Sequence, residues 1–199
     1  MKTTKRKNVT RLLIGILSLS LLISCIAWFA DSRNYVLYDC NGRAIALQST
    51  KIEIDKEGDY FGKIQGNIFT VVTDPLTMYD TNENKIAHAG DTYRIIAQDS
   101  HGIYIGRELM YEMVGKFELF GQEYEIYDYN GNYIGKFKYS PANFYGKFTD
   151  ANGTVIARYK SFWHLKDFKV KIYDDCELDE NSVLMMIGCY YSDYHYDNG

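Results

Sequence analysis

Residues 124–137 read YEIYDYNGNYIGKF, and this stretch decides the fold class. Apolar or aromatic residues alternate with polar ones on both sides of the tetrapeptide at 128–131, and a period of two is typical of a strand with one buried face. Aspartate at the first position of a turn and glycine at the fourth favour a type I turn that closes a hairpin. The stretch therefore predicts two antiparallel strands joined by a tight turn.

The tetrapeptide Asp-x-x-Gly recurs along the chain, usually after a tyrosine. Because aspartate and glycine favour tight turns, each copy predicts a turn between two strands. The chain is therefore predicted to be mainly β and built from successive hairpins. Further copies lie at residues 39–42, 55–58, 99–102 and 150–153, and residues 80–84 form a copy without glycine.

Several segments beside these turns have strand periodicity. Residues 166–173 place charged residues on one face and Phe168, Val170 and Ile172 on the other, so this strand is predicted to bury one face. The other predicted strands are residues 35–38 and 44–47, which would form the first hairpin, and residues 144–149 and 154–159, which flank the turn at 150–153.

Residues 183–191, VLMMIGCYY, interrupt the β pattern because they have no polar face. Asp179 or Asn181 could cap a helix that starts here. A helix that is apolar on all sides must be buried, and this one is too short to cross a bilayer. A strand is the alternative for so short a run, but the absence of alternation favours a helix inside the protein.

The side chains of residues 128–132 that carry oxygen atoms also have the spacing of the ligands in calcium loops. A complete loop needs a bidentate glutamate at its twelfth position, which is Tyr139 here, and hairpin chemistry already explains the residues. We therefore predict no metal site and no cofactor. The histidines are interpreted as solvated or strand-edge residues, since none accompanies a Cys-x-x-Cys pair. They are His88, His101, His164 and His195.

Acidic pairs precede the predicted helix. Asp174 with Asp175, or Glu177 with Asp179, could serve as general acid and base. Acids beside a helix start are more often caps and favourable partners of the helix dipole. The chain contains no Gly-x-Ser-x-Gly, no glycine-rich phosphate loop and no His-Glu-x-x-His. We therefore predict no catalytic residues and a protein that is not an enzyme.

The first thirty residues predict the cellular location. Residues 1–11 form a basic arm with five Lys or Arg residues, and residues 12–30, LLIGILSLSLLISCIAWFA, carry no charge. A run of this length is close to the ~20 residues that span a bilayer, and positive charges before it predict a cytoplasmic N-terminus. We expect a single-pass membrane anchor and an extracytoplasmic domain at 31–199.

Two alternatives remain for this segment. Residues 22–25, Leu-Ile-Ser-Cys, resemble the bacterial lipobox, which would make Cys25 the lipid-bearing residue of a lipoprotein. A cleaved signal with its cut site near residues 25–27 is the third interpretation, although the apolar run is long for one. All three interpretations place the folded domain at or across a membrane.

The composition of residues 31–199 fits one domain. The chain has 22 basic and 26 acidic residues, and five of the basic ones precede residue 12, so the domain carries 17 basic and 26 acidic side chains. A net charge of this sign disfavours phosphate backbones and anionic lipid headgroups. We therefore expect no nucleic-acid partner, and a protein or lipid partner of unknown identity.

Three cysteines follow Cys25, and an odd number is no disulfide framework. Cys40 and Cys176 could pair if the fold brings them together. The alternative is that all three are free, with Cys189 a small buried hydrophobic residue.

From residue 116 to 198 the chain resembles the LURP-one-related family of the tubby C-terminal-like superfamily. The segments that carry the resemblance are Lys116-Phe117, residues 124–131, residues 153–158 with 161–163, and the apolar run 184–193 with its His/Asp-rich tail. The resemblance implies a closed barrel of about twelve strands around a central hydrophobic helix.

The resemblance also implies that no catalytic site is expected. Relatives in the wider superfamily bind phosphoinositides or act on membrane phospholipids. We therefore expect a membrane-tethered, non-enzymatic barrel that binds a partner at the cell envelope, with a phospholipid-interacting domain as the alternative.

Overall fold

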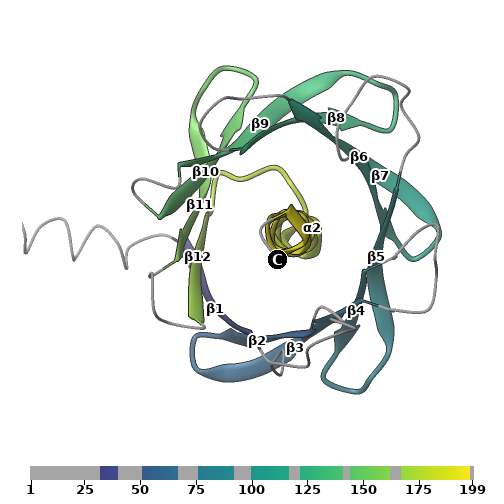
Figure 1. Cartoon of the computed structure of the whole chain (residues 1–199), viewed down its shortest axis with the longest axis vertical. Helices are drawn as coiled ribbons and strands as arrows, with labels where there is room; N and C mark the ends of the chain where they lie inside the picture. Colours follow the sequence, from purple (N-terminus) through teal and green to yellow (C-terminus); the bar gives the residue numbers. More distant parts are fainter. Residues whose placement is uncertain are drawn as a thin grey trace, which may run out of the picture. The chain divides into compact units, whose positions relative to one another are not determined.

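The computed structural model describes residues 32–39, 51–66, 76–91, 100–116, 122–140, 144–161 and 167–197. Twelve strands form a closed antiparallel barrel in which each strand pairs with its neighbours in sequence, and β1 pairs with β12 to close the ring (Figure 1). Helix α2 (Glu180–Asp197) lies inside the ring. The strands are β1 (Ser32–Asp39), β2 (Lys51–Lys56), β3 (Asp59–Gln65), β4 (Thr77–Asp80), β5 (Lys85–Asp91), β6 (Ser100–Ile105), β7 (Glu108–Lys116), β8 (Gln122–Asp128), β9 (Tyr133–Ser140), β10 (Tyr145–Asp150), β11 (Val155–Ser161) and β12 (Asp167–Tyr173).

This architecture confirms the predicted mainly β fold, with a closed twelve-stranded barrel around a C-terminal helix. Closure leaves no strand edge without a partner, which removes the usual route to edge-to-edge aggregation. The helix is longer than residues 183–191. It begins at Glu180 because Asp179 caps it, and it continues to Asp197 beyond the apolar run.

The interior of the barrel is filled with side chains. Residues 182–191 of α2 are all buried, as an apolar helix requires. Strand residues alternate between this core and the outside, so that Phe168, Val170 and Ile172 face inward as predicted. Cys189 is fully buried, which confirms its interpretation as a core residue.

The hairpin turns that the structure describes lie at one end of the barrel, which we call the turn end. The predicted turns at 55–58, 80–84, 128–131 and 150–153 are confirmed there. The segment 174–179, which leads from β12 into α2, lies at the same end. The helix therefore enters the barrel at the turn end.

The turn predicted at 99–102 is wrong. Residues 100–102 belong to β6, where Gly102 pairs with Gly90 on one side and with Glu112 on the other. Ladder pairing on both sides overrides the local turn signal, and the hairpin turns instead at Gly106, whose φ is +60°. In the Asp-x-x-Gly copy at 39–42, Asp39 is the last residue of β1. The other three residues of this copy and the predicted strand at 44–47 lie outside the described residues.

Two of the turns share one detailed geometry. In the turn after β8, the Gly131 amide donates to the Asp128 carbonyl at 2.9 Å and Gly131 has a φ of +81°. In the turn after β10, Gly153 donates to Asp150 at 3.1 Å with a φ of +87°. A type I turn followed by a left-handed residue matches the twist of the flanking strands.

The copy without glycine keeps this geometry. The Glu83 amide donates to the Asp80 carbonyl at 3.1 Å, and Glu83 takes a φ of +63°, the position that glycine holds in the other turns. A side chain in this conformation costs about 1–2 kcal/mol. An ion pair with Lys63 accompanies it.

We predict that Glu83→Gly is more stable than Glu83→Gln by about 1 kcal/mol, because both variants lose the ion pair and only glycine relieves the left-handed strain. Chemical unfolding of the full-length chain in mild detergent measures the difference. Equal unfolding midpoints for the two variants would contradict this account of the turn.

Residues 1–11, the predicted anchor at 12–30 and Cys25 lie outside the described residues, so these predictions stay predictions. Among the residues that the structure describes, no helix combines the length and the apolar character that a membrane span requires.

Candidate functional site

A cleft of about 380 Å³ opens at the turn end, between the turns after β8 and β10 and the segment that enters the helix. Pockets for small ligands have volumes of about 300–1,000 Å³. Its lining combines carboxylates, two phenols and apolar side chains. The lining residues are Tyr111, Asp128, Tyr133, Ile134, Asp150, Ala151, Asn152, Ile156, Asp175, Glu177 and Leu178.

Two of the four carboxylates in the cleft are the turn aspartates. Asp128 accepts hydrogen bonds from the Asn130 and Asn132 amides at 2.9 and 2.8 Å, and the bonds from Asn132 and Asn130 lower the pKa of its carboxyl. Burial would raise the pKa of the Asp150 carboxyl, but the hydrogen bonds from Thr154, whose amide lies 2.7 Å away, and from Asn152 together outweigh that effect, so its pKa is lowered too. Both side chains therefore stay negative into the acidic range.

The other two carboxylates, Asp175 and Glu177, come from the segment before the helix. Both are exposed, and neither forms an ion pair with a described residue. Tyr111 contributes a phenol at 3.5 Å from the Asp179 amide, and burial raises the pKa of that phenol. The cleft thus offers negative charge and aromatic rings, and no basic residue is among the described residues that line it.

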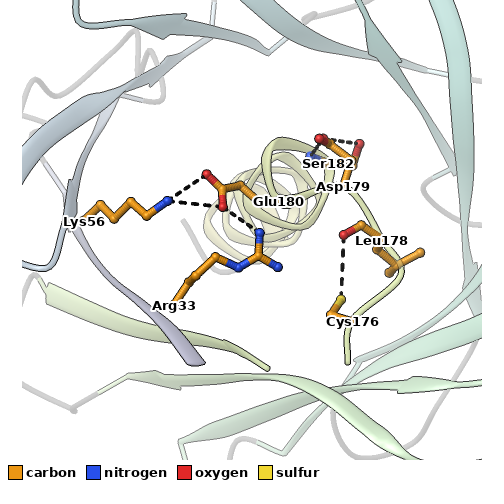
Figure 2. A network of polar contacts seen from close by, with 7 residues as sticks. All are labelled: Arg33, Lys56, Cys176, Leu178, Asp179, Glu180 and Ser182. Carbon is orange, nitrogen blue, oxygen red and sulfur yellow. Dashed lines mark hydrogen bonds and ion pairs between the residues drawn. The ribbon is translucent and has the colours of Figure 1, made fainter. Parts of the chain in front are cut away.

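A polar network fixes the start of the helix next to the cleft (Figure 2). Asp179 accepts hydrogen bonds from the Ser182 amide at 2.8 Å and the Ser182 hydroxyl at 3.1 Å, which confirms it as the helix cap. Glu180 lies 2.8 Å from the Arg33 guanidinium and 3.2 Å from the Lys56 ammonium. These contacts tie the helix to β1 and β2.

Burial alone would raise the pKa of the Glu180 carboxyl. The adjacent Tyr35 hydroxyl and the cations of Lys56 and Arg33 outweigh that effect, so the pKa lies below its ordinary value. The charge of Glu180 is therefore part of the folded state. Its side chain is only 16% exposed.

We predict that Glu180→Gln lowers the free energy of unfolding at neutral pH by about 1–3 kcal/mol, because Arg33 and Lys56 lose the negative charge of their partly buried partner. A lowered pKa in the folded state stabilises the protein above the ordinary carboxyl pKa, and this stability is lost as the pH falls through the folded value. The Glu180→Gln variant should therefore lack the loss of stability that titration of Glu180 causes at acidic pH. The free energy of unfolding of the full-length chain, measured at several pH values, tests this.

Glu177→Gln is the matched control, since Glu177 is exposed and forms no ion pair with a described residue. It should leave both the stability and its pH dependence nearly unchanged. An equal loss in both variants would contradict the role of the Glu180 contacts.

The far end of the helix is fixed in a similar way. Asp193 lies 2.9 Å from the His101 ring and accepts a hydrogen bond of 2.7 Å from the Tyr124 hydroxyl. Of the two interpretations, solvated or strand-edge, the first is therefore wrong for His101, which is partly buried near the start of β6. His88 stacks on Tyr104 with ring centroids 4.7 Å apart, and burial lowers its pKa.

Cys176 is half-buried, and its thiol lies 3.8 Å from the Leu178 carbonyl (Figure 2). Burial raises the pKa of the thiol, which keeps it protonated and weakly nucleophilic. Neither Cys176 nor Cys189 forms a disulfide bond with another described residue. The possible partner Cys40 lies outside the described residues.

No group of three or more His, Cys, Asp or Glu residues is placed to hold a metal ion within the described part of the chain. Among the described residues of the cleft lining, carboxylates and two tyrosine phenols are the groups that could transfer a proton, and none of these residues is a histidine, cysteine, serine or lysine. The chemistry that this arrangement supports is the binding of a cation, by charge and by the faces of the tyrosine rings.

The acids that the sequence singled out separate into two roles. Asp175 and Glu177 reach the cleft, whereas Asp179 caps the helix. Tyr139 faces the core rather than a calcium loop. Sequence reasoning missed Tyr111, because nothing in its local pattern shows that β7 borders the segment before the helix.

Comparison with known proteins identifies no relative: no family model, no curated protein and no solved structure matches the chain.

Proposed function

We propose that this chain is a membrane-tethered, non-enzymatic barrel that binds a cationic group of a partner at the cell envelope. The observation that carries the proposal is the acidic cleft at the turn end. The helix fills the barrel, so a ligand has to bind at the surface. The tether is the predicted anchor at 12–30, or a lipid on Cys25.

The chemistry of the cleft supports binding rather than catalysis. Its four carboxylates attract cations, and the rings of Tyr111 and Tyr133 offer faces on which an ammonium or a guanidinium is stabilised. Ile134, Ile156 and Leu178 suit the aliphatic stem of a lysine or arginine. The resemblance to a family without an expected catalytic site agrees with this proposal.

The cleft is tested by titrating full-length protein in neutral-lipid nanodiscs with a capped tetralysine peptide. We expect Asp175→Asn/Glu177→Gln to weaken binding about five- to tenfold at low salt, because two unpaired carboxylates are neutralised. Asp174→Asn/Asp59→Asn is the control, since both residues are exposed and neither is among the described residues that line the cleft. Equal losses in the two double variants would show that only net charge matters.

The topology is tested by adding protease to intact cells that express the full-length chain. Loss of the domain at 31–199 is expected, and full protection would overturn the extracytoplasmic location. Intact-mass measurement of the membrane-extracted protein then distinguishes a retained anchor from a cleaved segment and from lipid on Cys25.

A further inference from the structure

The chain enters the barrel at the turn end. Near the start of β1, the Asn34 carbonyl accepts a hydrogen bond of 3.1 Å from the Glu57 amide in the turn after β2. The Arg33 guanidinium lies 2.8 Å from Glu180 at the start of the helix (Figure 2). The first residues of β1 are therefore fixed to the same end of the barrel as the cleft.

The sequence between the predicted anchor and this entry point is short. The anchor is predicted to end at residue 30, three residues before Arg33. Three extended residues span at most about 10 Å. Asp39, at the other end of β1, lies six residues beyond Arg33, which adds roughly 20 Å along the strand. An anchor that ends at residue 30 therefore leaves the turn end nearer to the bilayer than the opposite end.

Exposed aromatic residues mark the same end. Among the residues that the structure describes, the large apolar side chains that are exposed are those of Tyr60, Tyr129 and Tyr133, at 44%, 69% and 42%. Tyr60 follows the turn after β2, Tyr129 lies in the turn after β8, and Tyr133 begins β9. Tyrosine is enriched at membrane–water interfaces, where its ring contacts lipid and its hydroxyl reaches water.

These tyrosines lie on opposite sides of the barrel. Tyr60 belongs to β3 and Tyr133 to β9, and the two strands are six positions apart in the ring of twelve (Figure 1). A compact ligand would contact one side of the turn end only. A flat surface laid across the end reaches both sides, which favours a bilayer.

We infer that the turn end is the surface of the domain that contacts the bilayer, with Tyr60, Tyr129 and Tyr133 at the level of the lipid headgroups. The inference rests on the proposed function, because it requires a retained anchor at 12–30. It also deepens that function, since the cationic group in the cleft then belongs to a partner that reaches the membrane surface.

The charge of the turn end selects the kind of bilayer. The described turns of this end, the segment before the helix and the strand residues that flank them carry eleven acidic and three basic side chains. They are residues 56–59, 80–85, 105–108, 128–133, 150–155 and 173–179. Anionic headgroups repel such a surface. We therefore expect contact with zwitterionic lipid and weaker contact with anionic lipid.

The test uses full-length protein in phosphatidylcholine nanodiscs that contain a lipid with a photoreactive headgroup, and mass spectrometry maps the labelled residues. We expect the segments around Tyr60 and Tyr129 to be labelled about fivefold more than Ser140 and Tyr145, which lie at the opposite end of β9 and β10. Equal labelling of both ends, or stronger labelling of the opposite end, would overturn the inference.

A second variant separates the tether from the tyrosines. Inserting about 20 Gly/Ser residues between Asp31 and Ser32 makes the tether long and flexible. In this extended chain, labelling of the turn end should depend on the rings, so that Tyr60→Ala/Tyr129→Ala lowers it about threefold and Tyr60→Phe/Tyr129→Phe retains it. Equal labelling of the Ala and Phe variants would overturn the role of the tyrosines. Thermal unfolding of each variant checks that the fold is intact.

Two further comparisons use the same extended chain. Replacing half of the phosphatidylcholine by phosphatidylglycerol should lower the labelling at low salt, and an increase would overturn the inference by assigning the turn end to anionic lipid. Titration with capped tetralysine should be the same for the Ala and Phe variants, because neither Tyr60 nor Tyr129 lines the cleft. Labelling of the turn end without tetralysine binding would support the inference and overturn the cation-binding function alone.

Discussion

Replacing Phe137 by alanine should lower the free energy of unfolding by about 3–5 kcal/mol. The side chain is fully buried on β9, where it packs against the helix and the neighbouring strands. Its ring centroid lies 4.6 Å from that of Phe148 and 5.2 Å from that of Tyr190. Its loss leaves a cavity between the barrel and α2 that the surrounding rings cannot fill. Chemical unfolding of the full-length chain in mild detergent measures the effect.

Tyr133→Ala is the matched control, because this aromatic residue of the same strand is 42% exposed. It should cost less than about 1 kcal/mol. Gly146→Ala provides a second comparison, since a Cβ there would lie 2.8 Å from the Phe137 ring. That substitution should cost less in the Phe137→Ala background than in the natural chain. Additive costs would contradict direct packing between these two positions.

Replacing Gly135 by alanine should lower the free energy of unfolding by about 3 kcal/mol. A Cβ at this position would lie 2.1 Å from the Thr149 carbonyl oxygen and 3.1 Å from the Asp150 Cα. These are backbone atoms of the paired strand β10, so relief requires the two strands to separate. Gly62 makes the same close approach to Tyr79 on β4, at 2.2 Å.

Gly90→Ala is the control for Gly135→Ala. Gly90 also lies in a strand, but a Cβ there would meet nothing within 4 Å. Its substitution should change the unfolding midpoint little. A cost for Gly135→Ala no larger than that for Gly90→Ala would show that the sheet adapts to the extra atom.

Local sequence was sufficient to predict several turns, because the interactions that form a turn act between neighbouring residues. The turns at 128–131 and 150–153 were predictable because aspartate and glycine occupy the positions that a type I turn with a left-handed fourth residue requires. The turn at 80–84 forms although glutamate stands where the other turns have glycine. Aspartate at the first position was therefore sufficient to predict this turn. The same signal failed at 99–102, where pairing on both sides of β6 determines the backbone.

The candidate site was only partly predictable. Asp175 and Glu177 stood out as acids before a helix, but their meeting with Asp128 and Asp150 depends on how the turns and the helix entry gather at one barrel end. The contact between Glu180 and Arg33 joins residues 147 positions apart. No local pattern contains that information.

By itself, the sequence determined the hairpins and the buried helix, because alternation and turn chemistry act between residues close in the chain. The net charge of the domain also disfavoured anionic partners, but that inference assumes that the charges are spread evenly over the surface. The tertiary structure decided where the charges lie. The strand register places Lys138, Lys147 and Arg158 side by side, although they lie apart in sequence. This arrangement matters because electrostatic attraction depends on the distances between charges and not on their sum.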